Sequence, residues 1–345
     1  MYNFFIILIL LYIVYVFFKI NKISEHFGVP TGDERPFINI YDDTGEQIKV
    51  VVLSHPFTRD SSWKQYENYR KDNFIVLGIS SYNEFPLRTS NKHDVLNDTK
   101  EKAWSYDYNK LIDGWLHCFR DPDKYIDPSS PKELISESDF CNYDVYKPDK
   151  NIKKIYDYIY VCPKDGPADD QKCDGWVSEN KNWKLALKCI KIMSGKLGLK
   201  GILVGREGCE LPSNCKHLLE TTGWLDQSKL IDHFRKSKFI LVPNQNDASP
   251  RILTEALCCD LPALLNYNIV GGWKYINDDN GALFRNIEEI EGGANFIMHN
   301  LDKMKPREQF LKYYGKENAG ARLKEFIERN YSDMIDIKNA KYLKI

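Results

Sequence analysis

The chain has 345 residues, of which 43% are hydrophobic and 13% aromatic, and its net charge is −1 at pH 7. This length is enough for two compact domains that each bury a core of their own. The balance of 48 basic against 49 acidic residues leaves no basic excess of the kind that binds nucleic acid. We therefore expect no nucleic-acid partner, and the substrate must be inferred from individual sites.

The chain begins with an apolar segment, Phe4–Phe18, that contains no charged residue. Its 15 residues are fewer than the ~20 that comfortably span a bilayer, but Tyr2 and Ile20 can lie at the two interfaces. A cleaved signal peptide is the alternative, but no basic region precedes the segment and no small-residue cleavage site follows it. We expect residues 1–20 to be a single transmembrane anchor.

The flanking residues bear on the orientation of this anchor. Lys19 and Lys22 follow the apolar segment and nothing basic precedes it, so the positive-inside rule predicts a cytosolic catalytic body. Two glycosylation sequons, at residues 97–99 and 330–332, would matter only on the lumenal side. We therefore expect a single-pass membrane protein with a cytosolic body, and a lumenal orientation stays open.

Nine cysteines, an odd number, occur without any C-x-x-C pair. This pattern indicates neither a disulfide framework nor a zinc site. We expect most of the cysteines to be small buried apolar residues in a reducing compartment.

The first half of the chain alternates strands and helices. Buried strands are expected over residues 48–54 and 74–80, with a helix over 61–70 between them. This alternation is typical of a parallel sheet covered by helices. Residues 104–119 are predicted to be a helix, and the Pro-rich segment 121–132 a loop.

The second half shows a clearer alternation that predicts a doubly wound α/β domain. One of its helices is expected to follow Asp226. The expected strands cover residues 158–162, 201–205, 239–243 and 263–265, and the expected helices cover 183–197, 227–237 and 250–258. An amphipathic helix near residues 322–330 follows.

The most informative segment is residues 243–262. An apolar strand ends at Pro243, a polar loop follows, and Ser249 is predicted to cap a helix whose first residue is Pro250. Ligands of open α/β sheets bind at the carboxyl ends of the strands, where free N–H groups of Ser249 to Ile252 suit a diphosphate.

Arg251 and Glu255 are four residues apart and share one face of this helix. An ordinary surface ion pair would contribute only about 0.3–0.5 kcal/mol and is the alternative interpretation. Because the pair follows an Asn/Asp/Ser loop at a strand end, we favour a binding site.

Seven residues separate Asp247 from Glu255, and this segment resembles the Glu-x7-Glu region of the group 1 (family four) glycosyltransferases. The resemblance implies a GT-B fold, with two Rossmann-like domains facing a cleft, and a nucleotide-sugar donor without a further cofactor. It implies that Glu255 holds the donor ribose and that Asp247 replaces the acid that contacts the sugar. Asp in place of Glu is a departure that shortens the reach by one methylene.

Three further segments, within residues 158–285, resemble the same family in order along the chain. Residues 179–183 are similar to its "E-K-G" turn, which implies that Lys181 contacts the diphosphate. Residues 205–208 are similar to its Gly-rich turn, with Arg206 as a further cation. Residues 223–225 are similar to its base-proximal turn, which places Trp224 near the base.

Residues 237–256 also resemble the donor region of exostosin-like transferases, which invert the anomeric centre. Retention is favoured and inversion stays open. His55, after the first strand, and His117 could reach the cleft and act on the acceptor or the sugar, although hydrogen-bonded structural histidines are the alternative.

Departure of the leaving group requires positive charge on the diphosphate, here supplied by Lys181, Arg251 and the helix N-terminus in place of a metal. The string Asp121-Pro122-Asp123 matches a metal-binding D-x-D motif, but it lies in a Pro-rich loop without a preceding apolar strand. We therefore expect no metal site.

Together these features predict a membrane-tethered glycosyltransferase that moves a sugar to a glycan, glycoprotein or lipid-linked acceptor. A catalytically inactive carbohydrate-binding or scaffold protein of the same fold is the second hypothesis. The expected parts are an anchor (1–20), a stem (21–47), a short acceptor-side Rossmann-like domain (48–150), a donor-binding Rossmann-like domain (151–300) and C-terminal helices (301–345).

Overall fold

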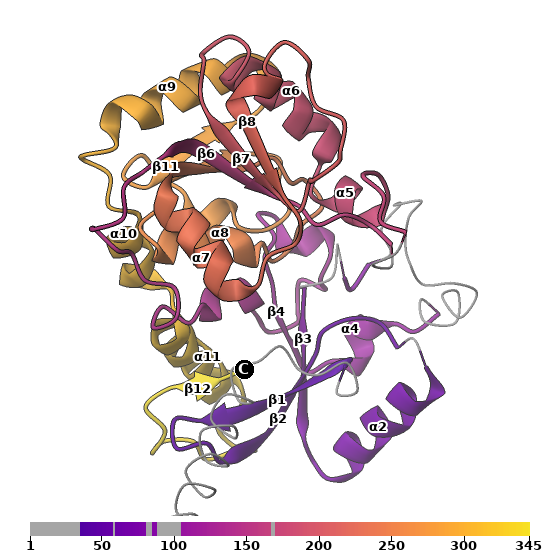
Figure 1. Ribbon diagram of the computed structural model, residues 1–345. Helices are drawn as coiled ribbons and strands as arrows, with labels where there is room; N and C mark the ends of the chain where they lie inside the picture. Colours follow the sequence, from indigo (N-terminus) through magenta and orange to yellow (C-terminus); the bar gives the residue numbers. More distant parts are fainter. Residues whose placement is uncertain (1–34, 58, 81–84, 88–104, 167–169) are drawn as a thin grey trace, which may run out of the picture.

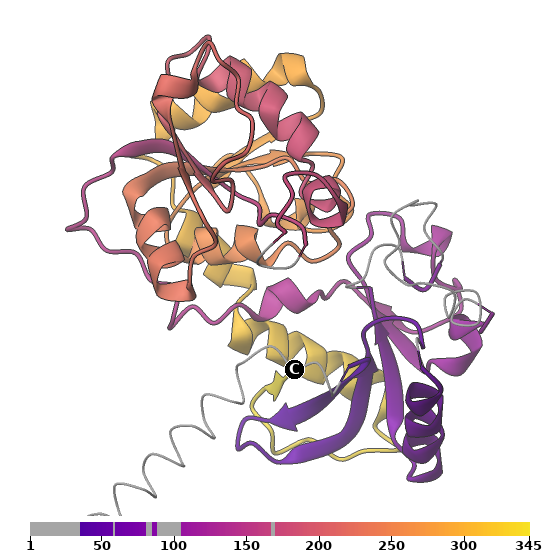
Figure 2. The ribbon, with the colours of Figure 1, turned by 45° about the vertical axis from the view of Figure 1, so that its right-hand side comes forward.

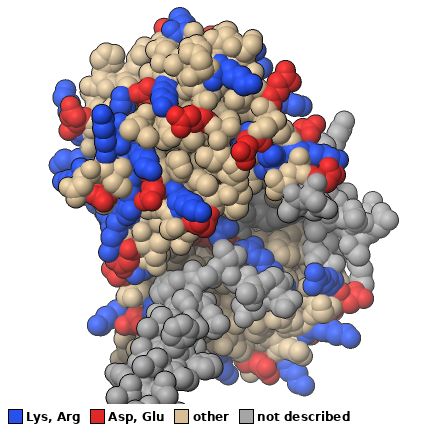
Figure 3. Space-filling model, viewed as in Figure 1, with Lys and Arg blue, Asp and Glu red and all other residues tan. Residues whose placement is uncertain are grey.

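The computed structural model describes residues 35–57, 59–80, 85–87, 105–166 and 170–345, which form two α/β domains (Figure 1). The predicted anchor and residues 21–34 of the predicted stem lie outside these residues. No helix within the described residues is long and apolar enough to cross a membrane. Basic and acidic side chains are mixed over the face seen in Figure 3, without a concentrated field of one sign on that face.

The C-terminal domain is built on a fully parallel six-stranded sheet with the order β11-β10-β9-β6-β7-β8. The chain runs outward from β6 through β7 to β8, and then crosses to the other side for β9, β10 and β11. The switch point therefore lies between β6 and β9, where open α/β sheets bind ligands. The strands are β6 (Tyr156–Val161), β7 (Gly201–Val204), β8 (Leu219–Thr222), β9 (Ser237–Val242), β10 (Ala263–Asn266) and β11 (Gly281–Phe284).

Helices cover both faces of this sheet, as the sequence predicted. One face packs against α6 (Trp183–Met193) and α9 (Ile290–Asn300), and the other against α7 (Gln227–Lys236), α8 (Arg251–Cys258) and α10 (Pro306–Tyr313). Asp226 caps α7 by accepting the Lys229 N–H at 2.9 Å, which confirms the predicted helix start.

The N-terminal domain has a mixed sheet with the order β12-β1-β2-β3-β4-β5, parallel from β2 to β5 and antiparallel where β1 meets β2 and β12. The predicted stem was therefore wrong for its last residues, because β1 lies within them. The strands are β1 (Phe37–Asp42), β2 (Gln47–Leu53), β3 (Ile75–Ile79), β4 (Gly114–Leu116), β5 (Lys132–Glu133) and β12 (Leu343–Lys344), accompanied by α2 (Asp60–Lys71) and α4 (Tyr108–Leu111).

The helix predicted over residues 104–119 was also wrong. Among its described residues only α4 is helical, and β4 follows it as a central strand of the sheet. Trp115 on β4 lies against Gly78 of β3, where an added Cβ would come within 2.3 Å of the indole ring. A strand that is buried on both faces has no alternation of polar and apolar residues, so its sequence resembled a helix.

The C-terminal helix α11 (Lys316–Tyr331) returns to the N-terminal domain, beside its strands (Figure 2). Leu323, Phe326 and Ile327 are fully buried in the same hydrophobic cluster as strands β1 to β4. The Tyr331 hydroxyl donates to the Asp113 carbonyl at 2.8 Å. Residues predicted as separate C-terminal helices therefore belong to the N-terminal domain. Helix α11 covers one face of its sheet and enlarges the domain that was predicted to be short.

The return of α11 predicts a large effect of Phe326→Ala. We expect a loss of about 3–5 kcal/mol in the free energy of unfolding, because the variant leaves a cavity beneath the sheet. Urea denaturation measures it. The matched control is Phe296→Ala on α9, where the ring is 38% exposed and the expected change is about 0.5 kcal/mol or less. Equal losses in the two variants would contradict this packing.

Candidate functional site

The switch point of the C-terminal sheet is held together by side-chain amides. Asn182 and Asn266 each donate from Nδ2 to the Pro243 carbonyl at 3.1 Å, at the end of β9. Asn182 also caps α6 by accepting the Leu185 N–H. The start of α6 is thereby fastened to the loop that follows β9.

Lys181 and Asp247 meet at this junction. The Lys181 Nζ lies 2.7 Å from the Asp247 Oδ2, which also accepts the Asn244 Nδ2 at 2.8 Å. The Lys181 side chain is 23% exposed and that of Asp247 only 9%. The two residues assigned to the diphosphate and the sugar are therefore one ion pair, with the lysine as its more accessible end.

Glu255 lies one turn of α8 after Arg251. Among the described residues these two side chains form no ion pair, so the alternative interpretation as an ordinary surface ion pair was wrong. Glu255 is partly buried and Arg251 is exposed. Burial raises the pKa of the Glu255 carboxyl above its usual range. The Tyr146 hydroxyl and the charges of Arg251 and Lys181 oppose this rise only in part.

Ser249 does not cap α8, which corrects the predicted helix start. The helix begins at Arg251 after a non-helical Pro250, and the Ser249 hydroxyl instead accepts the Ser138 N–H of the other domain at 2.9 Å. The Ser249 N–H donates to Asp247, and the Arg251 N–H donates to the Ser249 carbonyl. The N–H groups predicted to bind a diphosphate are therefore largely engaged within the loop.

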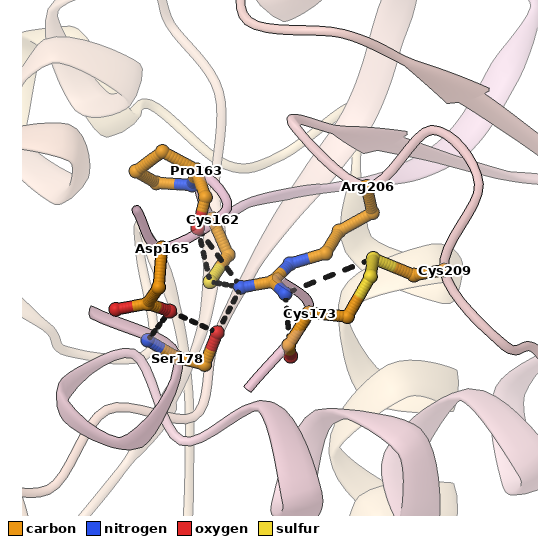
Figure 4. Close-up of a disulfide and its surroundings, with 7 residues drawn as sticks. All are labelled: Cys162, Pro163, Asp165, Cys173, Ser178, Arg206 and Cys209. Atoms are coloured by element: carbon orange, nitrogen blue, oxygen red, sulfur yellow. Dashed lines mark hydrogen bonds between the residues drawn. A yellow bond between two sulfur atoms is a disulfide. The ribbon is translucent and has the colours of Figure 1, made fainter. Parts of the chain in front are cut away.

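Arg206 is completely buried, so the prediction that it contacts the donor was wrong for this conformation. Its guanidinium donates to the Pro163 carbonyl at 3.0 Å and to the Ser178 hydroxyl at 2.8 Å (Figure 4). Beside it, Cys173 and Cys209 form a disulfide, which the cysteine pattern had not indicated. The other seven cysteines are free and buried, as expected.

Trp224 follows β8 at the carboxyl edge of the sheet and is 61% exposed. Its ring is open to stacking by a planar ligand. The proposed proximity to a nucleotide base stays a prediction.

The two predicted histidines follow strands of the N-terminal domain. His117 is buried just after β4, its Nδ1 has no hydrogen-bond partner, and burial lowers its pKa to about 4. His55 follows β2, and its Nδ1 lies 2.9 Å from the Pro56 carbonyl; burial lowers its pKa as well. Both imidazoles are therefore neutral at neutral pH.

The D-x-D string pairs with lysines. Asp121 lies 3.1 Å from the Lys124 Nζ, and Asp123 lies 2.9 Å from the Lys132 Nζ. Across the described ranges, no group of three or more His, Cys, Asp or Glu side chains could hold a metal ion.

No family model and no curated protein matches the chain. Among solved structures, it resembles sucrose-phosphate synthase from Thermosynechococcus elongatus with a TM-score of 0.58 and 11% identity, over 83% of this chain and 74% of that protein. HepE from Anabaena, solved in complex with UDP, gives a TM-score of 0.57 and 10% identity over 81% and 78%. TarM gives a TM-score of 0.56 and 13% identity over 80% of this chain, which spans 54% of TarM. The chain has the GT-B fold.

In this GT-B chain, the contacts between the two domains were not predicted from the sequence. The Trp273 Nε1 donates to the Cys118 carbonyl at 3.0 Å, and the Arg120 guanidinium lies over the rings of Tyr267 and Trp273. No local pattern marks these residues, because each contact joins residues more than 100 positions apart in the chain.

The burial of Glu255 predicts a pH-dependent cost to stability. Its raised pKa means that the folded state favours the protonated form, so the ionised form lowers the free energy of unfolding above that pKa. We expect Glu255→Gln to raise Tm at neutral pH, with the gain fading as the pH falls and Glu255 takes up a proton. Thermal unfolding over a pH series measures this.

Glu325→Gln on the exposed face of α11 is the control and should leave Tm unchanged at every pH. A Glu255→Gln variant that is less stable than the unaltered chain at neutral pH would mean that the neighbouring cations outweigh the cost of burial.

Proposed function

We propose that this chain is a glycosyltransferase that uses a nucleotide-sugar donor. The observation that carries the proposal is the Lys181–Asp247 pair at the switch point of the C-terminal sheet. It lies where doubly wound sheets bind ligands, within a fold that sucrose-phosphate synthase also has. Neighbours such as HepE were solved with UDP, which supports a uridine nucleotide as the first donor to test.

The charged groups at this junction suit departure of a nucleoside diphosphate. Lys181 and Arg251 would stabilise the negative charge that grows on the leaving diphosphate, which requires no metal. Glu255 would accept hydrogen bonds from the ribose hydroxyls in its ionised form. Trp224 is exposed for stacking on the base.

We propose retention of configuration. Asp247 is already the acceptor for Lys181, Asn244 and the Ser249 N–H, so we assign it to sugar contacts and not to proton abstraction. Inverting transfer would need a general base from the other domain, for which neutral His117 is the candidate. The anomeric configuration of the product, read by NMR, distinguishes the two.

The acceptor and the location are also proposals. An apolar N-terminus supports a membrane anchor and an acceptor close to the membrane, either a glycan or a lipid-linked sugar. The Cys173–Cys209 disulfide favours an oxidising compartment and therefore the lumenal orientation over the cytosolic one. Occupancy of the two sequons in cells would test this orientation.

The donor proposal predicts stabilisation by nucleotides. UDP in hundredfold excess over its Kd should raise the free energy of unfolding of the full chain in detergent by about 2.7 kcal/mol. Lys181→Met should weaken UDP binding about tenfold to a hundredfold, because a charge-assisted hydrogen bond is lost. Isothermal titration calorimetry measures the affinity.

The matched control is Lys184→Met, which removes an exposed lysine from the outer face of α6 and should leave the affinity unchanged. No stabilisation by any nucleoside diphosphate or nucleotide sugar would contradict donor binding and favour a non-catalytic scaffold.

A further inference from the structure

The buried Arg206 side chain forms hydrogen bonds with several residues that lie between β6 and α5 (Trp176–Asn180) or within α5. The Arg206 guanidinium donates to the Cys162 sulfur and the Pro163 carbonyl at the end of β6, and to the Cys173 carbonyl further on. It also donates to the Ser178 hydroxyl within α5 (Figure 4). Arg206 therefore joins residues 162–163, Cys173 and Ser178 to one another.

The start of α5 is fixed by a second group. The Asp165 carboxylate accepts the N–H groups of Val177 and Ser178 and the Ser178 hydroxyl, the last at 2.7 Å. Gly175 before the helix has a φ of +135°, and a Cβ there would lie 2.7 Å from the Asp165 carboxyl carbon. Ser178 thus connects Asp165 to Arg206, and α5 has little freedom to move without disturbing both.

Lys181 lies at the end of α5, between two contacts of Arg206. The guanidinium bonds Ser178 before it and lies 4.7 Å from the ring of Trp183 after it. The Tyr160 hydroxyl donates to the Lys181 carbonyl at 3.0 Å. The backbone that carries the Lys181 ammonium is therefore held from both sides, and Arg206 touches each side.

The Cys173–Cys209 disulfide links the residues before α5 to the turn that carries Arg206. Cys173 belongs to the segment before α5, Cys209 follows the turn after β7, and the Cys209 N–H donates to the Arg206 carbonyl. Cys173 is only partly buried, so a reductant in solution can reach the bond. Burial raises the pKa of the Cys162 thiol, which stays protonated and unreactive beside the guanidinium.

We propose that Arg206 and the Cys173–Cys209 disulfide position Lys181, so that binding of a nucleoside diphosphate depends on the oxidised disulfide. This rests on the function proposed above. A dithiol reductant would break the S–S bond by exchange: two electrons and two protons pass to Cys173 and Cys209, and the reductant becomes a cyclic disulfide. The segment before α5 then loses its tie to the β7 turn, and Lys181 loses its fixed position.

Hydrogen exchange and UDP affinity test this in the full chain. Arg206→Gln, and separately the Cys173→Ser/Cys209→Ser pair, should speed amide exchange over residues 176–181 and leave β9 protected. Both should weaken UDP binding by about tenfold. Unchanged exchange over 176–181 in both variants would overturn the proposal, as would faster exchange with unchanged UDP affinity. Faster exchange in a chain that binds no UDP even when unaltered would support the positioning role and contradict the proposed function.

The controls separate positioning from a general loss of stability. Dithiothreitol should reproduce the double-serine result in the unaltered chain and change nothing in the double-serine variant. Arg329→Gln, which removes an exposed arginine paired with Glu133, should alter neither readout. If Arg206→Gln does not fold, reduction of the unaltered chain remains a test: two additional free thiols by mass spectrometry, beyond the seven of the oxidised chain, with unchanged exchange over 176–181 would overturn the proposal.

Discussion

A single buried carboxylate joins the parts of this molecule. Asp139, in the short 3-10 turn Glu137–Phe140, has no exposed surface, and it accepts from the Lys274 Nζ at 2.8 Å, from Arg322 at 2.6 Å and from the Tyr275 hydroxyl. Lys274 and Tyr275 come from the C-terminal domain, and Arg322 comes from α11. Buried charges persist only when they are paired, so both domains and the returning helix must be in place together.

The cluster of Asp139 with Lys274, Tyr275 and Arg322 also contacts the loop of the candidate site. Ser138, next to Asp139, bonds Ser249, and the loop that carries Lys274 donates from Gly271 to the Asp247 carbonyl. The loop around Asp247 is thus held between the cluster and the Lys181 side of the sheet. Any rotation of the two domains would have to break the Ser138–Ser249 hydrogen bond and the Asp139–Lys274 pair, both of which lie close to the loop that carries Asp247.

The sequence predicted what is local. Helices α6, α7 and α8 follow from periodicity and helix starts, which leave short-range patterns, whereas α5, α9 and α10 were not predicted. The pairing of Lys181 with Asp247 was not predicted either, because the sequence analysis gave the two residues separate contacts. β4 and the return of α11 could not be predicted in this way. A strand buried on both faces has no alternation, and a helix at the end of the chain carries no sign of the domain that it covers.

The three cations that were predicted to bind the donor also have environments that the sequence alone did not reveal. Lys181, Arg206 and Arg251 each follow or begin a helix or turn at the carboxyl edge of the sheet, yet one is paired with Asp247, one is fully buried and one is exposed. Burial and pairing, which depend on distant segments, decide which charge a ligand can use. The Lys181 ammonium uses one of its three donors on Asp247, and its side chain is 23% exposed, so donors remain that a ligand could reach. Because Asp247 already balances the charge of Lys181, the free site needs no large excess of positive charge to be stable.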